Sequence, residues 1–231
     1  MEQTQQMINV GSAYLDAVNN LKEDQPQEVA QILEILNCIH PVSGYHFGIY
    51  IEEPSPFGAV THACDQSWFH CYQGKEEPIM RRPYTSPKWK DGDSEDTLYL
   101  RFTFEMFEHL HIEPSLMGAW QAYLLCISKT LLPFSGILYY TKRKLIMSND
   151  QLRDIRPLLR LKIIPELENL EVDVAPSVTI DGNNALVSCC YWNDWGGLIR
   201  EYVPVFFNND RVRIGDFHDE VLIKFDCGIM F

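Results

Sequence analysis

A tryptophan-rich turn near the C-terminus combines residue types that could support acid–base chemistry. Asp194 lies between Trp192 and Trp195 and is followed by Gly196 and Gly197. A carboxylate held between two indoles would be desolvated, which would raise its pKa and make it a usable general acid. The structural alternative is a wide turn or bulge whose tryptophans fill the edge of the core. The sequence favours that alternative because the motif has no defined catalytic partner.

Two histidines and two cysteines of metal-binding type lie close together in the chain. His62, Cys64, His70 and Cys71 follow an H-x-C-x5-H-C pattern, whereas zinc ribbons and zinc fingers use other spacings. Alternation along a strand would place His62 and Cys64 on one face, which favours them slightly as a ligand pair. A reduced, buried cluster fits the spacing better, so the sequence predicts no metal site and no cofactor.

A second group of carboxylates and imidazoles follows residue 104. In a helix, Glu105 and His109 would share a face, as would Glu108 and His111. Di-metal carboxylate bundles use a Glu-x-x-His pair twice, together with two further glutamates, and the sequence holds no second copy. We therefore expect ordinary surface pairs here.

A basic segment at residues 142–162 stands out in an otherwise acidic chain. Arg153, Arg156 and Arg160 recur at three- and four-residue steps, so one helical face would carry three guanidinium groups. Such a face could clamp a phosphate or an acidic partner. It could equally pair with the protein's own surplus of carboxylates, and this interpretation is favoured because charge runs are usually solvated faces.

The net charge of the chain is −13, with seven cysteines among its 231 residues. An acidic surface repels nucleic-acid backbones and anionic membranes, so neither is expected as a partner, and it attracts basic proteins. The sequence shows no export signal and no apolar run long enough to span a bilayer. We therefore expect a cytoplasmic protein with reduced cysteines.

Apolar periodicity predicts helices in the first two thirds of the chain. Residues 4–21 and 26–39 each repeat apolar side chains at three- and four-residue steps and predict a helical hairpin. Residues 114–132 predict a further helix. Ser148 or Asn149 is expected to cap another helix that begins directly afterwards.

Strand patterns predominate in the last quarter of the chain. Residues 45–53 and 97–104 read as earlier strands, residues 54–96 are irregular, and residues 136–147 suggest a hairpin. The C-terminal strands, separated by Asn-, Asp- and Gly-rich turns, are expected at residues 177–181, 185–192, 198–207, 211–217 and 220–226. The prediction is one α+β domain over residues 1–231, with helices packed on a C-terminal antiparallel meander. The alternative is a subdivision into a mixed helical region, residues 1–165, and an antiparallel sheet, residues 166–231.

The sequence contains no nucleophile elbow, phosphate-binding loop, dinucleotide-binding turn or zinc-protease helix. Two functional hypotheses from different classes remain. The leading hypothesis is a non-catalytic inhibitor-type protein whose acidic surface binds a basic protein partner. Its exposed aromatic anchors would come from three tryptophans, Trp68, Trp89 and Trp195. The alternative is a hydrolase or small-ligand enzyme with a pocket between residues 54–96 and the C-terminal sheet. Its titratable residues would be Asp194, His70 and His218, with Trp192 and Trp195 as walls.

Overall fold

A computed structural model of the chain describes residues 1–25, 27–52, 66–74, 78–82, 105–128, 131–132, 143–155, 172–193, 196–208 and 211–224. Helices and two small sheets precede a larger antiparallel sheet formed mainly by the C-terminal strands. The predicted α+β class is therefore confirmed. Among the described helices, none is both long enough and apolar enough to cross a membrane.

The first helix, α1 (Glu2–Asn20), is amphipathic, as its sequence predicts. Its buried residues are Met7, Gly11, Tyr14 and Val18, spaced at three- and four-residue steps. The exposed side is rich in glutamine and asparagine. Because most of the stability of a helix in a protein comes from packing its apolar face, α1 depends on burying this stripe against the rest of the molecule.

The second helix, α2 (Glu28–Ile35), packs against α1 but is shorter than the predicted segment 26–39. The backbone leaves the helix at Leu36. Ile39 instead begins strand β1 (Ile39–Pro41), where it pairs with Ile112 of strand β5 (Leu110–Ile112). Both isoleucine side chains are fully buried. Apolar periodicity could not separate the two outcomes, because Ile39 would be buried in either conformation.

Helix α4 (Leu116–Cys126) lies at the centre of the molecule and is buried on nearly every side. Ser115 caps its N-terminal end by accepting a hydrogen bond from the Gly118 N–H. The helix ends at Cys126, well before the predicted residue 132. Two side-chain hydrogen bonds join it to α1: the Trp120 indole N–H donates to the Met7 carbonyl at 3.0 Å, and the Tyr14 hydroxyl donates to the Leu124 carbonyl at 3.2 Å.

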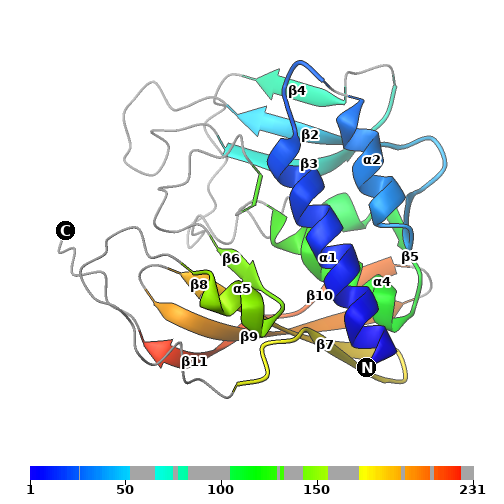
Figure 1. The fold of residues 1–231 in the computed structure, drawn as a ribbon. Helices are drawn as coiled ribbons and strands as arrows, with labels where there is room; N and C mark the ends of the chain where they lie inside the picture. The colour runs from blue at the N-terminus through cyan, green and yellow to red at the C-terminus, as the bar shows by residue number, and fades with distance from the viewer. Residues whose placement is uncertain are drawn as a thin grey trace, which may run out of the picture.

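A three-stranded sheet occupies part of the segment that looked irregular in sequence. Strand β2 (His46–Glu52) confirms the strand predicted at 45–53 and forms the centre of this sheet. It pairs antiparallel with β3 (Gln66–Tyr72) and parallel with β4 (Ile79–Arg82). Figure 1 shows this sheet at one end of the molecule and the larger sheet at the other, with α1 running from the level of one to the level of the other.

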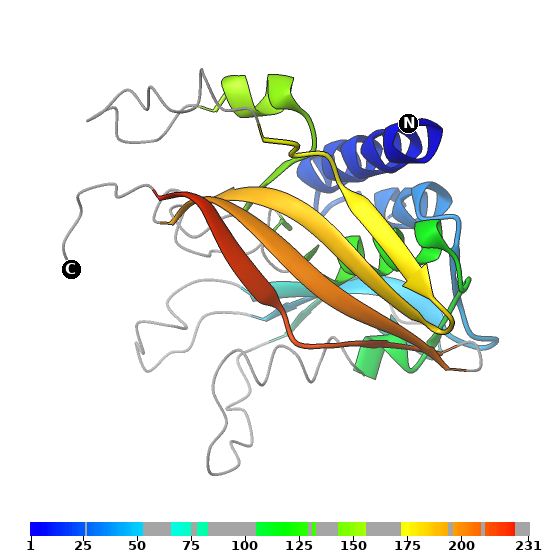
Figure 2. The same ribbon diagram turned by 90° about the horizontal axis from the view of Figure 1, so that it is seen from below.

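The larger sheet is built on two long strands, β8 (Asn184–Asn193) and β9 (Gly197–Asn208), which pair along their whole length. The outer side of β9 is shared by β10 (Arg211–Ile214) and β11 (His218–Lys224). The outer side of β8 is shared by β7 (Ser177–Asp181) and β6 (Lys144–Ile146). Figure 2 shows the strong twist of this sheet. The predicted C-terminal antiparallel sheet is confirmed: β7 to β10 form a meander, and β11 returns to pair with β9.

Strand β6 departs from the hairpin suggested at residues 136–147. It pairs with β8, opposite Cys190, Tyr191 and Trp192, while residues 136–141 lie outside the described ranges, as do residues 97–104. The helix that follows, α5 (Asn149–Arg153), is capped by Ser148, which accepts from the Gln151 N–H. The structure thus selects Ser148 from the two predicted caps.

The two faces of the larger sheet bury different sets of side chains. One face joins a continuous core with α1, α4 and the small sheets, through residues that include Val187, Val203 and Val205. The other face is partly covered near α5 by a smaller cluster that contains Trp192, Leu198 and Ile223. Alternate residues of β8 and β9 supply the two sets, as the two-residue period of a strand requires.

Candidate functional site

The described residues of the tryptophan-rich turn fit the structural alternative, a turn in which tryptophan fills the edge of the core. Trp192 is 0% exposed and belongs to the smaller core. Asn193 pairs with Gly197 across the β8–β9 connection, and Gly197 has a φ of 95°, a conformation that favours glycine. Asp194 and Trp195 lie outside the described residues.

The other tryptophans and histidines of the predicted site lie on or beyond β3. Trp68 is only 8% exposed and stacks on Tyr50 with a ring separation of 4.7 Å, so its indole is not an exposed anchor. His70 contacts the rings of Tyr50 and Tyr72. Trp89 lies outside the described residues. His218 begins β11 in the larger sheet, whereas His70 lies in β3 of the three-stranded sheet. The two histidines therefore lie in different sheets of the described structure.

The predicted metal-ligand groups give no complete site in the part of the chain that the structure describes. No set of three histidine, cysteine, aspartate or glutamate side chains there is arranged to hold one ion. Cys71 is a free thiol, and His62 and Cys64 lie outside the described ranges. The helical pairing considered for Glu105 and His109 is wrong, because the segment leaves the helix after residue 107 and enters β5.

The basic segment pairs internally where it is described. Arg153 donates to the Asp150 carboxylate at 3.0 Å on the exposed surface of α5. Arg156 and Arg160 lie outside the described residues. A second arginine of the same segment, Arg143, forms an ion pair with Glu201 of β9.

A row of carboxylates lies along one margin of the larger sheet. Strand β11 pairs with β9, and within the described ranges no strand lies along its other side (Figure 2). Asp216, which precedes the strand, and Asp219 and Glu220 within it are all exposed. Val221 is 57% exposed beside them. An edge strand of this kind presents N–H and C=O groups that can pair with another chain.

Two tyrosine hydroxyls hold the carboxylates of this acidic edge, which we define as residues 216–221. The Tyr191 hydroxyl donates to Asp219 Oδ2 at 3.0 Å, and the Tyr202 hydroxyl donates to Glu220 Oε2 at 2.8 Å. Register places Asp219 opposite Glu201, and Glu220 opposite Arg200, so the two side chains lie on opposite faces of the sheet. The edge therefore presents negative charge on both faces.

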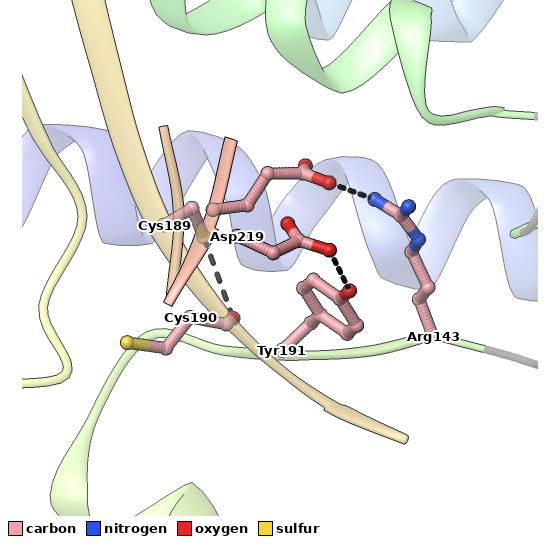
Figure 3. Close-up of polar contacts among 6 residues, drawn as sticks. Arg143, Cys189, Cys190, Tyr191 and Asp219 are labelled. Carbon is pink, nitrogen blue, oxygen red and sulfur yellow. Dashed lines mark hydrogen bonds and ion pairs between the residues drawn. The ribbon is translucent and has the colours of Figure 1, made fainter. Parts of the chain in front are cut away.

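Beneath the edge lies the buried ion pair of Arg143 and Glu201. Glu201 is 0% exposed, while the Arg143 side chain keeps 23% of its surface exposed. The guanidinium also lies over the ring of Tyr191, 4.5 Å from its centroid. Figure 3 shows Tyr191 beside Arg143, with its hydroxyl directed to the Asp219 carboxylate. The ion pair thus neutralises the inner carboxylate and leaves the charge of Asp219 at the surface.

Burial shifts the pKa values of this cluster. It raises the pKa of Glu201, and the Arg143 guanidinium opposes that rise. Burial also raises the pKa of the Tyr191 hydroxyl, so this group remains a hydrogen-bond donor to Asp219. Within the described residues, neither Glu201 Oε2 nor the Tyr123 hydroxyl has a hydrogen bond of good geometry. Tyr123 nevertheless lies close enough to Glu201 to lower its pKa.

Sequence reasoning missed Glu201, although β9 contains a signal for it. Ile199, Val203 and Val205 occupy alternate positions of one face, and Glu201 is the charged residue in the same phase. A carboxylate at a buried strand position requires a partner. The identity of that partner, Arg143, could not be read from the sequence, because 58 residues separate the two in the chain.

Comparison of the chain with protein-family models, with curated proteins and with solved structures finds no match.

Proposed function

We propose that this protein is a non-catalytic binding protein that captures a basic protein partner along the acidic edge. The observation that carries the proposal is the exposed margin of β11, where Asp216, Asp219 and Glu220 flank an unshared strand edge in the described part of the sheet. An extended segment that adds to such an edge gains main-chain hydrogen bonds, and its side chains meet the carboxylates.

Charge supports a basic partner over a second copy of this chain. The net charge of −13 opposes self-association, and the local carboxylates would face one another if two β11 edges paired. A lysine- or arginine-rich segment would be attracted by the same field, which also accelerates diffusional encounter. The acidic edge therefore disfavours aggregation and selects for opposite charge.

Preorganisation supports binding at this edge in particular. The hydroxyls of Tyr191 and Tyr202 already orient the carboxylates of Asp219 and Glu220. Less side-chain entropy is lost on binding when groups are fixed in advance. Exposed carboxylates on α1, such as that of Asp16, lie on a helix surface that offers no backbone edge.

The test uses a synthetic peptide of alternating lysine and valine residues as the probe. Its affinity for the wild-type protein is measured by fluorescence anisotropy at low and at physiological salt. The edge variant D216N/D219N/E220Q should bind at least about tenfold more weakly. The matched variant E2Q/D16N/E34Q removes the same charge from the helices and should change affinity by less than about threefold.

A second probe separates strand addition from simple charge attraction. The same peptide with N-methyl groups on alternate residues keeps its charge but loses backbone donors. Strand addition predicts that N-methylation abolishes the specific component of binding. Equal losses of affinity in the edge variant and the helix variant, or full binding of the N-methylated probe, would refute the proposal.

A further inference from the structure

The ribbon of β1 and β5 brings three histidines close together. Register places His40 directly opposite His111, and the Val42 N–H donates to the His109 carbonyl at 2.9 Å as the next pair along. Ile39 and Ile112, one position away, are fully buried on the other face. Because strand side chains alternate between faces, His40 and His111 project from the outer face. His109, which directly precedes β5, lines the same hollow as these two residues.

These imidazoles line a hollow of about 650 Å³ together with Ser43, Glu108 and Arg211. Arg211 reaches it from the start of β10, which packs beside β5. In the described part of the chain Arg211 makes no ion pair. His109 is held by a stacked contact with Tyr45, with ring centroids 4.0 Å apart and an angle of 12° between the rings.

We propose that this histidine hollow binds a small tetrahedral oxyanion of the phosphate or sulfate type, and that binding strengthens as the pH falls through the histidine range. A guanidinium and several imidazole N–H groups are the donors that such an anion requires. Histidine side chains gain positive charge between about pH 8 and pH 5, so acidification would convert a weakly charged hollow into a cationic one.

The groups around the imidazoles are compatible with this behaviour. Among the described residues that line the hollow, Glu108 is the one acidic residue, and Arg211 is a permanent cation. Glu113 follows β5, and Arg213 lies further along β10. Helix α4, which packs behind the ribbon, carries no charged side chain. Protonation of the three histidines would therefore outweigh the acidic groups nearby.

A bound metal ion is the competing possibility for three histidines. No three potential ligands in the described residues are placed to share one ion, and the Arg211 guanidinium would repel a cation. The site is independent of the acidic edge, which lies on β11. The hollow would thus recognise its ligand through positive charge, whereas the acidic edge would recognise the proposed basic partner through negative charge.

The test is a calorimetric titration of the whole protein with sodium sulfate, whose charge is constant over the pH range used. Affinity should be at least about tenfold higher at about pH 6 than at about pH 8. The variants H111Q and R211Q should each weaken binding at about pH 6 by about tenfold. The variant H218Q, which removes an exposed imidazole from β11, should leave it unchanged.

Further arms identify the ligand class and can overturn the proposal. A phosphomonoester should compete with sulfate, and acetate should compete poorly because it lacks the tetrahedral set of oxygens. Circular dichroism checks that H111Q and R211Q remain folded. Sulfate binding that ignores pH, sulfate binding that survives in R211Q, or tight binding of Zn²⁺ in place of sulfate would each overturn the assignment.

Discussion

Arg143 donates a hydrogen bond to Glu201 across 58 residues of sequence, and the carboxylate it reaches is completely removed from solvent. Burying a carboxylate is costly unless it is paired. The Arg143 guanidinium, at the margin of the sheet, supplies the partner and also stacks on Tyr191. The pair therefore connects the start of β6, the centre of β9 and the tyrosine that holds Asp219.

Removal of the arginine should destabilise the protein more than removal of the carboxylate. R143M leaves Glu201 buried without its cation and is expected to lower the free energy of unfolding by about 3 kcal/mol. E201Q leaves Arg143 partly in contact with water and should cost about 1 kcal/mol. Urea denaturation measures both. If the double variant R143M/E201Q is less stable than R143M alone, the buried charge is not the source of the loss.

The cost of R143M should also depend on pH. Burial already raises the pKa of Glu201 in the folded state, and loss of Arg143 would raise it further. A group whose pKa is higher in the folded state contributes stability at low pH, and that stability is lost as the pH rises through the folded pKa. The difference from wild type should thus be small near about pH 4 and grow toward about pH 8. R143M/E201Q has no carboxyl group at position 201, so its difference from wild type should not grow with pH.

The Tyr191 hydroxyl should contribute both to stability and to the acidic edge. Y191F keeps the ring under Arg143 but removes the donor to Asp219, at an expected cost of about 1 kcal/mol. Y202F removes the more exposed bond to Glu220 and should cost less. Thermal unfolding compares the two variants, and a larger loss in Y202F would contradict the role assigned to Tyr191.

The C-terminal sheet was predictable because its information is local. Alternating side chains mark the strands β7 to β11, and Asn-, Asp- and Gly-rich turns separate them. Strand β6 could not be assigned to the sheet in this way. It reaches β8 from a distant part of the chain, and its three residues carry no pattern that identifies the partner.

The candidate sites were less predictable for the same reason. The sequence indicated a general surplus of carboxylates, but the acidic edge depends on β11 being the outer strand. The histidine hollow depends on the register of β1 with β5, which joins His40 to His111. Glu105 and His109 were instead compared at helical spacing, and that spacing does not apply in a segment that becomes a strand.

The described cysteines should react slowly with alkylating reagents in the folded protein. Burial raises the pKa of Cys38 to about 11, with a further contribution from Glu113, and raises the pKa of Cys71 to about 12. At about pH 8 only about one thiol in a thousand or fewer would be ionised. Timed alkylation with iodoacetamide, followed by peptide mass spectrometry, should show both sites protected by at least about a hundredfold relative to denatured protein, and Cys71 more strongly than Cys38. Equal rates in the two states would contradict this.

Two helix glycines should respond differently to alanine because of what surrounds them. At Gly118 an added Cβ would lie 2.0 Å from the Glu113 carbonyl oxygen, part of a backbone that the Ser115 cap holds in place. G118A should therefore destabilise the protein by about 2 kcal/mol despite the better helix propensity of alanine. At Gly11 the nearest atom is the Met147 sulfur at 2.5 Å, in a flexible side chain that can move. G11A should cost clearly less than G118A in urea denaturation, and the reverse order would show that the packing of Met147 against α1 is the more rigid of the two.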